Sequence, residues 1–461
     1  MKTFSIVTYG CQMNISDSER VAAVCELMGY TQANSDTPAD VYILNTCSIR
    51  QKAEDRVIGM GKKYYKLKKE NPGIKIVLTG CMAKRDLRQT KEKSSRYEAS
   101  YHAQLRKKMP WLDFIIPINE IHTLPTVLNE AVTEHISEYF AVTPSYNSAF
   151  QAYIPISTGC NKFCTFCIVP FTRGKEEYRS FEQVYAEVEQ AIGQGFKEIT
   201  LLGQNVNSWS DTNTLRSPIT PLRSSTQGGN NRDFTFLMDQ LASIPGEYWL
   251  RFTSSHPYDI NLNLIDTIAS RPAIAKSIHF ALQSGSNSVL KRMNRYYIRE
   301  EFKEKVEIIR EKIPGAGLTT DVIVGFCGET EKEFQDTARL CEELRFDQIY
   351  ISEYSQREGT IASKFYPDNV PRKVKAERKS VLDNILKQGV AKNNEQLIGS
   401  EQKALVYKTR SKNKAGIFAK TTHGKDVHIE LHPEKGMIEP GSFVTVQVTG
   451  HSGFCLQGRL A

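Results

Sequence analysis

The chain has 461 residues, enough for two to four domains of roughly 100–200 residues each. Its hydrophobic fraction of 40% and charged fraction of 24% are ordinary for a globular protein, and no apolar run approaches the roughly 18 residues of a membrane span. The 60 basic and 52 acidic residues give a net charge of +8, too mild to indicate a partner by itself. The opening stretch MKTFSIVTYGCQMN is unlike a signal peptide, so we expect a cytoplasmic protein with no membrane segment.

The first segment, residues 1–140, alternates short apolar stretches with helical patterns. This alternation predicts a domain with a parallel sheet and helices on both faces. We expect strands in KTFSIVTYG, DVYILNT, IKIVLTG and LDFIIPI, and helices in SDSERVAAVCELMGY and AEDRVIGMGKKYYKLKKE. Cys11, Cys47 and Cys81 each follow one of the first three strands. Because the carboxyl ends of parallel strands meet at one edge of a sheet, we expect these thiols to lie together.

Three clustered thiols in a chain without an export signal indicate metal or redox chemistry rather than disulfides. A [4Fe–4S] cluster with one iron left open by the protein suits this set best. Zinc with a fourth ligand and three simply buried thiols are the alternatives. Three other cysteines lie in apolar patterns and are expected to be small buried hydrophobic residues, namely Cys25, Cys341 and Cys455.

The second segment, residues 146–390, has six more strand candidates separated by helical patterns. Six βα units are fewer than the eight of a full barrel, so we expect a partial (β/α)6 barrel. The strand candidates are YIPISTGC, EITLLGQN, YWLRFTSSH, KSIHFALQS, LTTDVIVG and DQIYISEYS. Residues 211–233 are rich in Ser, Thr, Asn, Gly and Pro and are expected to form an inserted, mobile loop.

Three cysteines follow the first barrel strand in the pattern C-x-x-x-C-x-x-C: Cys160, Cys164 and Cys167. Barrel active sites gather at the carboxyl ends of the strands. Three thiolates on one loop can ligate three irons of a [4Fe–4S] cluster and leave the fourth open. Zinc would need a fourth ligand, and no second pair of cysteines lies nearby to supply it.

The last segment, residues 396–461, consists of short strand patterns with no helix between them, which predicts a small all-β barrel or sandwich. Its stretch YKTRSKNK has four basic residues that suit contact with RNA phosphates, namely Lys408, Arg410, Lys412 and Lys414. A second basic stretch covers residues 84–108. A solvated loop and a charged helix face are the alternatives for the two stretches.

The stretch GCNKFCTFCIVPFTRG resembles the cluster motif of the radical S-adenosylmethionine (SAM) superfamily. The resemblance implies that its three cysteines hold a [4Fe–4S] cluster, that SAM binds the fourth iron, and that the cluster splits SAM to a deoxyadenosyl radical. It also implies that Phe166 lies near the adenine of SAM. We expect the other SAM-binding groups among polar residues at the strand ends, namely Gly203, Gln204, Asn205, Ser254, Gln283 and Asp321.

With its second cysteine set, the whole chain resembles the methylthiotransferases. These enzymes combine an N-terminal domain carrying a three-cysteine auxiliary cluster, a radical SAM barrel and a C-terminal RNA-binding β domain of the TRAM type. The matching stretches include TYGCQMNISDSER, LNTCSIRQKAEDR, FTSSHP, LQSGSNSVLKRMNR and TDVIVGFCGET. The stretch GQNVN is most similar to the branch that acts on isopentenylated adenosine beside the anticodon of tRNA.

The resemblance implies methylthiolation at carbon 2 of that adenine. One SAM would methylate a sulfur on the auxiliary cluster and a second would supply the radical, so two SAM molecules and two [4Fe–4S] clusters serve one turnover. The implied partners are a tRNA anticodon stem-loop carrying isopentenyladenosine, an electron donor such as flavodoxin or ferredoxin, and a sulfur donor or cluster-assembly protein.

Two alternatives to this function are a sister enzyme and a protein of a different class. A sister methylthiotransferase would act on threonylcarbamoyladenosine in tRNA or on an aspartate of a ribosomal protein. An iron–sulfur electron carrier or a non-catalytic RNA-binding regulator would be a different class, although a carrier would favour four cysteines per cluster. Cys327 stands where the methylthiotransferases usually have proline, and we expect a passive substitution rather than a seventh ligand.

Overall fold

The structure is a computed structural model, and its description covers residues 2–34, 37–49, 51–85, 94–132, 136–211, 232–411, 414–430 and 438–461. For residues 94–98, 410, 411, 414 and 415 only the backbone is described. The chain divides into two compact units. The first comprises Met1–Asn147, Ser157–Phe163 and Cys167–Arg179, and the second comprises Ser148–Ile156, Cys164–Phe166 and Ser180–Ala461.

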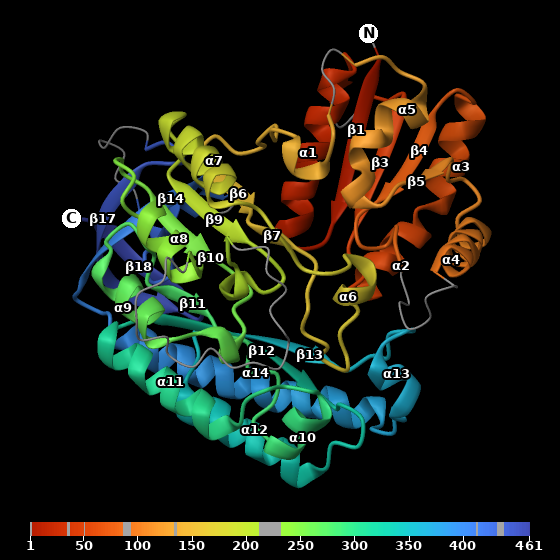
Figure 1. The fold of residues 1–461 in the computed structure, drawn as a ribbon. Helices are drawn as coiled ribbons and strands as arrows, with labels where there is room; N and C mark the ends of the chain where they lie inside the picture. The colour runs from red at the N-terminus through yellow and green to blue at the C-terminus, as the bar shows by residue number, and fades with distance from the viewer. Residues whose placement is uncertain are drawn as a thin grey trace. The chain divides into compact units, whose positions relative to one another are not determined.

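The first unit is built on a parallel sheet of five strands in the order β2-β1-β3-β4-β5, coloured red to orange in Figure 1. The strands are β1 (Thr3–Tyr9), β2 (Thr31–Gln32), β3 (Val41–Thr46), β4 (Lys75–Thr79) and β5 (Phe114–Ile115). All six residues of β3 are buried, as expected for the central strand of a sheet covered on both sides.

Helices cover both faces of this sheet, as predicted. The helices are α1 (Gln12–Leu27), α2 (Gln51–Gly59), α3 (Gly61–Glu70), α4 (Ser94–Lys108) and α5 (Leu124–Leu128). The two faces form separate cores, because side chains alternate along a strand. Ile43 and Val77 pack into one core, while Leu44 and Ile76 pack into the other.

The single helix expected over residues 53–70 is instead two helices, α2 and α3, that meet at Met60. The break places Tyr64 against Trp111, with the ring centroids 4.9 Å apart in a stacked arrangement. At Gly61 an added Cβ would lie only 3.2 Å from Nε1 of Trp111. Packing around a tryptophan distant in sequence therefore decides this boundary.

The second unit contains six parallel strands, which confirms the expected partial barrel. They are β6 (Gln151–Pro155), β9 (Glu198–Leu202), β10 (Trp249–Phe252), β11 (Ser277–His279), β12 (Gly317–Val324) and β13 (Gln348–Glu353). They pair as β10-β9-β6 and β11-β12-β13. Isolated parallel bridges, Leu250 to Ile274 and Ser255 to Phe280, link the two halves. Within the described residues, no pairing joins β13 back to β6.

Helices of the second unit lie on the outside of these strands (Figure 1). They are α7 (Phe181–Gly193), α8 (Phe234–Leu241), α9 (Leu262–Ser270), α10 (Asn287–Arg292), α11 (Arg299–Lys312), α12 (Glu331–Leu344) and α13 (Ile361–Phe365). The loop expected at 211–233 falls largely on residues 212–231, outside the described part of the chain. Its flanks meet in an antiparallel bridge between Ser210 and Asp233.

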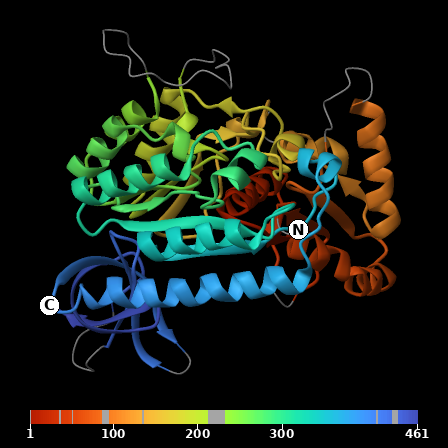
Figure 2. The same cartoon turned by 90° about the horizontal axis from the view of Figure 1, so that it is seen from below.

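The C-terminal part of the second unit is a closed five-stranded barrel, so the structure decides between the barrel and the sandwich that the sequence left open. Its strands are β14 (Glu401–Ser411), β15 (Lys414–Thr421), β16 (Asp426–Ile429), β17 (Phe443–Ser452) and β18 (Cys455–Leu460). Strand β18 was not predicted. Helix α14 (Arg372–Glu395) leads to this barrel, packing on β13, α12 and β17 (Figure 2).

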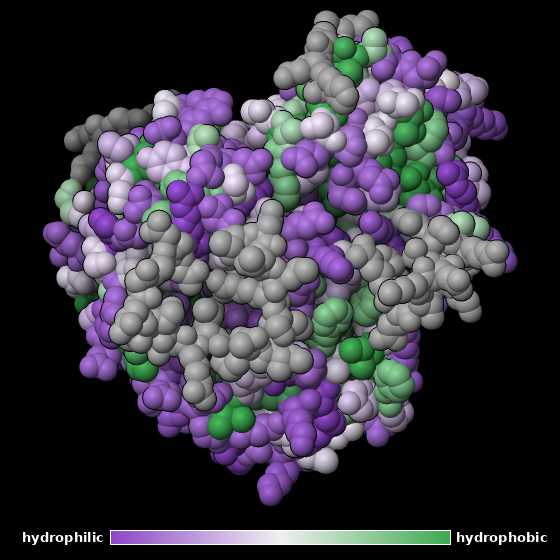
Figure 3. All heavy atoms as spheres, in the orientation of Figure 1, coloured by the Kyte–Doolittle hydropathy of each residue, from purple (hydrophilic) through white to green (hydrophobic). Residues whose placement is uncertain are grey.

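The face of the molecule drawn in Figure 3 is largely hydrophilic, with hydrophobic residues in separate areas among the described atoms. Among the residues that the structure describes, no helix combines the length and apolar character needed to cross a bilayer.

Candidate functional site

The first cysteine set lies at the carboxyl edge of the five-stranded sheet. Cys11 follows β1, Cys47 follows β3 and Cys81 follows β4, and these three strands are neighbours in the sheet. Cys47 and Cys81 are each 2% exposed, and their thiols are hydrogen-bonded to each other. Cys11 interacts electrostatically with both. The structure therefore brings together three residues that are dispersed in the sequence.

Two glycines and a buried amide pair shape this edge. A Cβ added to Gly10 would lie 1.9 Å from Oδ1 of Asn14. A Cβ added to Gly80 would lie 2.3 Å from Oδ1 of Asn45. Asn14 donates to Asn45 Oδ1 over 3.0 Å, and Asn45 donates back to the Asn14 carbonyl over 2.8 Å. The glycine before the cysteine in YGC and TGC is thus needed because fully buried amides lie directly against the chain.

The thiols of this set differ in acidity. Burial raises the pKa of Cys11. The hydrogen bond with Cys81, followed by burial, raises the pKa of Cys47. The same bond lowers the pKa of Cys81, and the Arg173 guanidinium, whose Nε lies 3.1 Å from Cys81 Sγ, lowers it further. Cys81 therefore has the most stabilised thiolate, the form that binds metals.

The second cysteine set lies on the loop after β6. Cys160 and Cys167 belong to the first unit and Cys164 to the second. Cys160 and Cys164 are each 8% exposed. In the first unit, the Cys160 sulfur accepts the backbone N–H of Lys162 over 3.4 Å. In the second, the Cys164 sulfur accepts a hydrogen bond from Nη1 of Arg295 over 3.3 Å.

Arg295 connects Cys164 to the loop that follows β11. Its Nη2 donates to the carbonyl of Ala281 over 3.0 Å, and the hydroxyl of Tyr297 donates to the same carbonyl over 3.0 Å. The ring of Tyr297 lies edge-on to that of His256, with centroids 5.8 Å apart. Cys164 is thus connected, through Arg295 and Tyr297, to the loop after β11 and to His256 after β10.

Phe166 is half-buried and packs against an apolar cluster that includes Met293, Phe326 and Cys327. Cys327 is 3% exposed, and its sulfur lies 3.7 Å from the carbonyl oxygen of Tyr366. Burial raises the pKa of the Cys327 thiol. The buried, apolar surroundings of Cys327 are typical of a side chain that only packs in the core.

The stretch GQNVN begins directly after β9 and forms hydrogen bonds with the loop after β10. Asn205 donates to Asp259 over 2.8 Å. Asn207 donates to the His256 carbonyl and accepts the His256 N–H, each over 3.0 Å. Gly203 and Gln204 lie beside them, Gly203 buried and Gln204 partly exposed. Asn205 and Asn207 thereby hold two strand ends of the barrel together.

Two strand-end candidates adopt a left-handed backbone, Ser254 with φ 65° and Gln283 with φ 69°. Non-glycine residues rarely adopt this conformation, and it often marks functional loops. Gln283 is 9% exposed, and its N–H donates to the carbonyl of Asp321 over 2.8 Å.

The expectation that Asp321 ends a strand is wrong. Asp321 lies within β12 and pairs with Tyr350 of β13. Its side chain is 41% exposed and accepts a hydrogen bond from Nε2 of His279 over 2.9 Å. The strand continues to Val324 because the next residues keep the alternation of buried and partly exposed side chains.

Of the expected RNA-binding residues, Lys408 and Arg410 lie on β14 and Lys414 lies on β15. Lys408 is exposed. The side chains of Arg410 and Lys414 are not described, and Lys412 lies outside the described residues. In the basic stretch 84–108, residues 86–93 also lie outside them.

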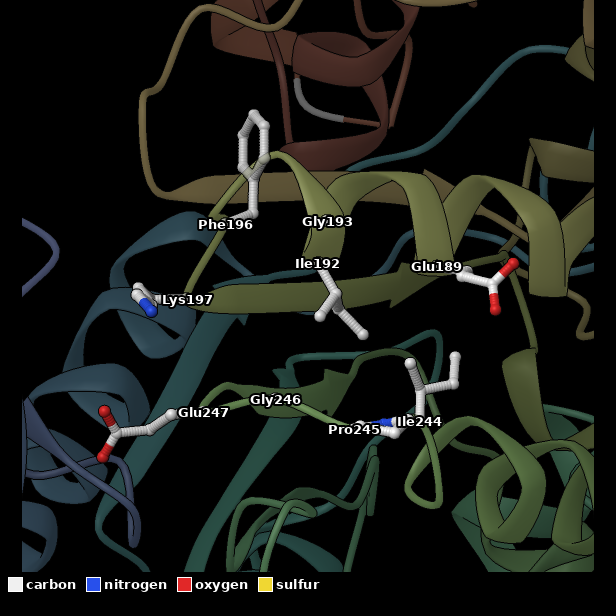
Figure 4. A pocket seen from close by; sticks show the side chains of 9 residues that line it. All are labelled: Glu189, Ile192, Gly193, Phe196, Lys197, Ile244, Pro245, Gly246 and Glu247. Atoms are coloured by element: carbon white, nitrogen blue, oxygen red, sulfur yellow. The ribbon is translucent and has the colours of Figure 1, made fainter.

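A pocket with a volume of about 320 Å³ lies elsewhere on the barrel (Figure 4). Its lining comes from the end of α7 and from the segments that precede β9 and β10, with Glu189, Ile192 and Ile244 among the residues shown. It therefore lies at the amino ends of the strands, whereas the cysteines and GQNVN follow the carboxyl ends.

Among the described residues, no three His, Cys, Asp or Glu side chains are grouped so as to hold a single metal ion. A single zinc ion needs every ligand within about 2.3 Å of one point. The ligands of a four-iron cluster bind different irons and are spaced more widely. Three neighbouring thiols fit a cluster of this kind, and N–H groups are directed at the sulfurs of Cys47 and Cys81.

Sequence analysis missed the polar partners of these cysteines. Arg173 reaches Cys81 from 92 residues away, and Arg295 reaches Cys164 from 131 residues away. His279 and Tyr297 were also not identified. The stretches FTRG and RMNR contain the two arginines, but no local pattern indicates that either one faces a sulfur.

Comparison with known proteins defines the class of this fold. Residues 154–341 match the family model described as "Radical SAM superfamily", and residues 3–100 match "Uncharacterized protein family UPF0004". The barrel and this match make the chain a radical SAM enzyme, a class that uses a [4Fe–4S] cluster and SAM.

Curated relatives identify the family within this class. Proteins named tRNA-2-methylthio-N(6)-dimethylallyladenosine synthase match along nearly the whole chain. The relative from Pelotomaculum thermopropionicum is 34% identical, covering 98% of this chain and 96% of that protein. The relative from Dictyoglomus thermophilum is 36% identical, covering 100% of this chain and 99% of that protein. The chain belongs to the tRNA-2-methylthio-N(6)-dimethylallyladenosine synthase family.

Proposed function

We propose that this enzyme methylthiolates carbon 2 of N6-isopentenyladenosine beside the anticodon of tRNA, giving 2-methylthio-N6-isopentenyladenosine. The relatives that match the whole chain carry the name of this activity. The single observation that carries the proposal is the meeting of three thiols at the edge of the first sheet, in a chain that also has the radical SAM motif. A radical enzyme that only abstracts hydrogen needs one cluster, whereas insertion of sulfur also needs a sulfur carrier.

Each cysteine set offers three thiols, and N–H donors to their sulfurs, that suit a cluster with one open iron. We assign Cys160, Cys164 and Cys167 to the cluster that binds SAM, and Cys11, Cys47 and Cys81 to an auxiliary cluster. Such a cluster with bound SAM supplies a radical able to attack an unactivated C–H bond. N–H donors directed at Cys164 and Cys81 support this assignment, because hydrogen bonds to ligand sulfurs tune iron–sulfur clusters.

The residues around the barrel mouth would bind and orient SAM. Phe166 offers an apolar ring, and the loops after β9, β10 and β11 offer amides and hydroxyls. Their linkage through His256 and Arg295 favours a mouth that is ordered before SAM binds. The proposed SAM-binding residues are Phe166, Gly203, Gln204, Asn205, Ser254, Gln283 and Asp321.

The remaining assignments extend this proposal. We assign residues 1–140 to a methylthiotransferase domain, 146–390 to the radical SAM core and 396–461 to a TRAM-type barrel that binds the tRNA. Its proposed contacts are Lys408, Arg410, Lys412 and Lys414. The proposal also includes two SAM molecules per turnover and a cytoplasmic location. Its further partners are an electron donor such as flavodoxin or ferredoxin, and a sulfur donor or cluster-assembly protein.

Nucleoside analysis tests the activity. Mass spectrometry of tRNA from cells that lack this protein will show isopentenyladenosine without its methylthio group, and the gene supplied in trans will restore the group. In vitro, the reconstituted enzyme will modify tRNA that carries the isopentenyl group and not tRNA that lacks it. Equal turnover of both tRNAs would contradict the substrate assignment. Modification of threonylcarbamoyladenosine would favour the sister activity.

A further inference from the structure

Arg173 lies just after helix α6 (Val169–Thr172), in the segment of the first unit that also carries Cys167. Its Nε atom donates a hydrogen bond to Sγ of Cys81 over 3.1 Å. Its Nη2 atom donates to Oδ2 of Asp17, and the side chains of this ion pair are 2% and 0% exposed. One buried guanidinium is therefore shared between a carboxylate and a cysteine sulfur.

Asp17 is itself held in one orientation. It lies on α1, the helix whose N-terminal cap is Cys11. Its second oxygen, Oδ1, accepts a hydrogen bond from the hydroxyl of Tyr139 over 2.7 Å. The guanidinium of Arg20 lies 5.5 Å from the ring centroid of Tyr139. With both carboxylate oxygens engaged, Asp17 holds Arg173 so that its Nε faces Cys81.

Stability alone is a poor explanation for this arrangement. The desolvation of two charges offsets most of their attraction in a protein interior, and apolar side chains of similar volume often serve as well. Apolar side chains cannot donate an N–H to sulfur. Such a bond draws electron density from a ligand thiolate and raises the reduction potential of the cluster bound there.

We propose that Arg173 is a positioning residue for the auxiliary cluster, with Asp17 and Tyr139 as its supports. Its hydrogen bond to Cys81 raises the reduction potential of that cluster. The same side chain fastens the segment of Cys167 to the sheet edge where the auxiliary cysteines meet. This inference rests on the proposed function, because it requires a cluster on those cysteines.

The test uses the full-length chain with Cys160, Cys164 and Cys167 replaced by alanine, so that only the auxiliary cluster is assembled. In this background, Arg173→Gln and Arg173→Lys are compared after anaerobic reconstitution. We expect Arg173→Gln to change the electron paramagnetic resonance spectrum of the reduced cluster and to shift its midpoint potential to a more negative value. Arg173→Lys keeps the charge but loses the guanidinium geometry, so we expect a smaller shift in the same direction.

Arg378→Gln is the matched control, because it also breaks a buried ion pair. Arg378 donates to Oε2 of Glu329 over 2.9 Å, with side chains 6% and 1% exposed, and no described bond joins it to a cysteine. We expect this variant to lower the unfolding temperature while leaving the spectrum and the potential unchanged. Asp17→Asn, which releases Arg173 from its support, is expected to shift the potential in the direction of Arg173→Gln.

The outcomes separate the two proposals. If the alanine background assembles no cluster, the proposed function fails at its auxiliary site. If the cluster assembles, and both Arg173 variants keep its spectrum and potential, the role of Arg173 is overturned. If Arg173→Gln is too unstable to purify, Arg173→Lys decides, and an unchanged potential in that variant again overturns the proposal. Loss of iron from Arg173→Gln with circular dichroism like that of Arg378→Gln would support it.

Discussion

Arg295 donates a hydrogen bond from Nη1 to the sulfur of Cys164 over 3.3 Å, while its Nη2 holds the carbonyl of Ala281 at 3.0 Å. One side chain thus connects a cysteine of the radical SAM motif to the loop that follows β11. A hydrogen bond to a charged partner is worth about 1.5–3 kcal/mol, and each 1.4 kcal/mol corresponds to about tenfold in an equilibrium constant.

Arg295→Gln is therefore expected to lower the rate of SAM cleavage by roughly ten- to a hundredfold, because the cluster loses a donor that favours its reduced state. The measurement is the release of 5′-deoxyadenosine with a chemical reductant, in a chain whose Cys11, Cys47 and Cys81 are alanine. Arg299→Gln, which removes a surface ion pair with Glu300, serves as the control. A normal cleavage rate with full iron content in Arg295→Gln would contradict the expectation.

Replacing each cysteine set by alanine is expected to remove one cluster. The reconstituted wild-type chain should contain about eight irons, and either triple variant about four, because a cubane cluster holds four. SAM cleavage should be lost only when Cys160, Cys164 and Cys167 are replaced. Four irons in the wild-type chain would contradict the two-cluster assignment. Cys341→Ala, which removes a buried thiol in α12, should leave the iron content unchanged and serves as the control.

Asn207→Ala is expected to destabilise the barrel mouth. Asn207 is 6% exposed and pairs with both the N–H and the carbonyl of His256. Its loss removes two buried hydrogen bonds, worth about 0.5–1.5 kcal/mol each. The His256 N–H keeps its bond to Asn205 Oδ1, and the His256 carbonyl keeps its bond from the Asp259 N–H. Urea denaturation will measure this loss in the free energy of unfolding. The exposed residue Asn263 of α9 provides the control Asn263→Ala, for which a change below about 0.5 kcal/mol is expected. Equal stability of the two variants would count against the role of Asn207.

Glu333 is expected to make the stability of the second unit pH-dependent. Burial alone would raise its pKa, but hydrogen bonds from Arg292 and Ser288 outweigh it and lower the pKa to about 2. The folded pKa is thus below the unfolded value of about 4.3, and stability gained from ionisation is fully present above that value. It is lost as the pH falls toward about 2. Urea midpoints measured between pH 7 and pH 3 should fall less steeply for Glu333→Gln than for the wild type, and parallel curves would refute this.

Lys408→Ala is expected to weaken tRNA binding and to reduce the dependence of affinity on salt by about one counterion. Lys408 is exposed on β14, within the proposed RNA-binding barrel. Filter binding over a series of salt concentrations measures both effects. Lys373→Ala, which removes a charge with 88% side-chain exposure on α14, is the control. An affinity for tRNA that does not change with salt concentration would contradict the proposed phosphate contacts.

The sequence predicted most of the strands and the positions of the cysteines after them. A cysteine just after each of three apolar stretches predicted that the three thiols share one sheet edge, because parallel strands present their carboxyl ends together. The boundary between α2 and α3 could not be predicted, since Trp111 lies far along the chain from Met60. The closing strand β18 was also not predicted. It forms a hairpin with β17 and closes the barrel by parallel pairing with β16, a contact that no local pattern in the sequence indicates.

The sequence by itself determined the features that depend on local spacing: the C-x-x-x-C-x-x-C loop, the alternation of strand and helix, and glycine before Cys11 and Cys81. Tertiary structure alone decided which side chains surround the sulfurs. Arg173 and Arg295 reach their cysteines across 92 and 131 residues. Contacts over such separations follow from how the elements pack, and packing leaves no periodic signal in the chain.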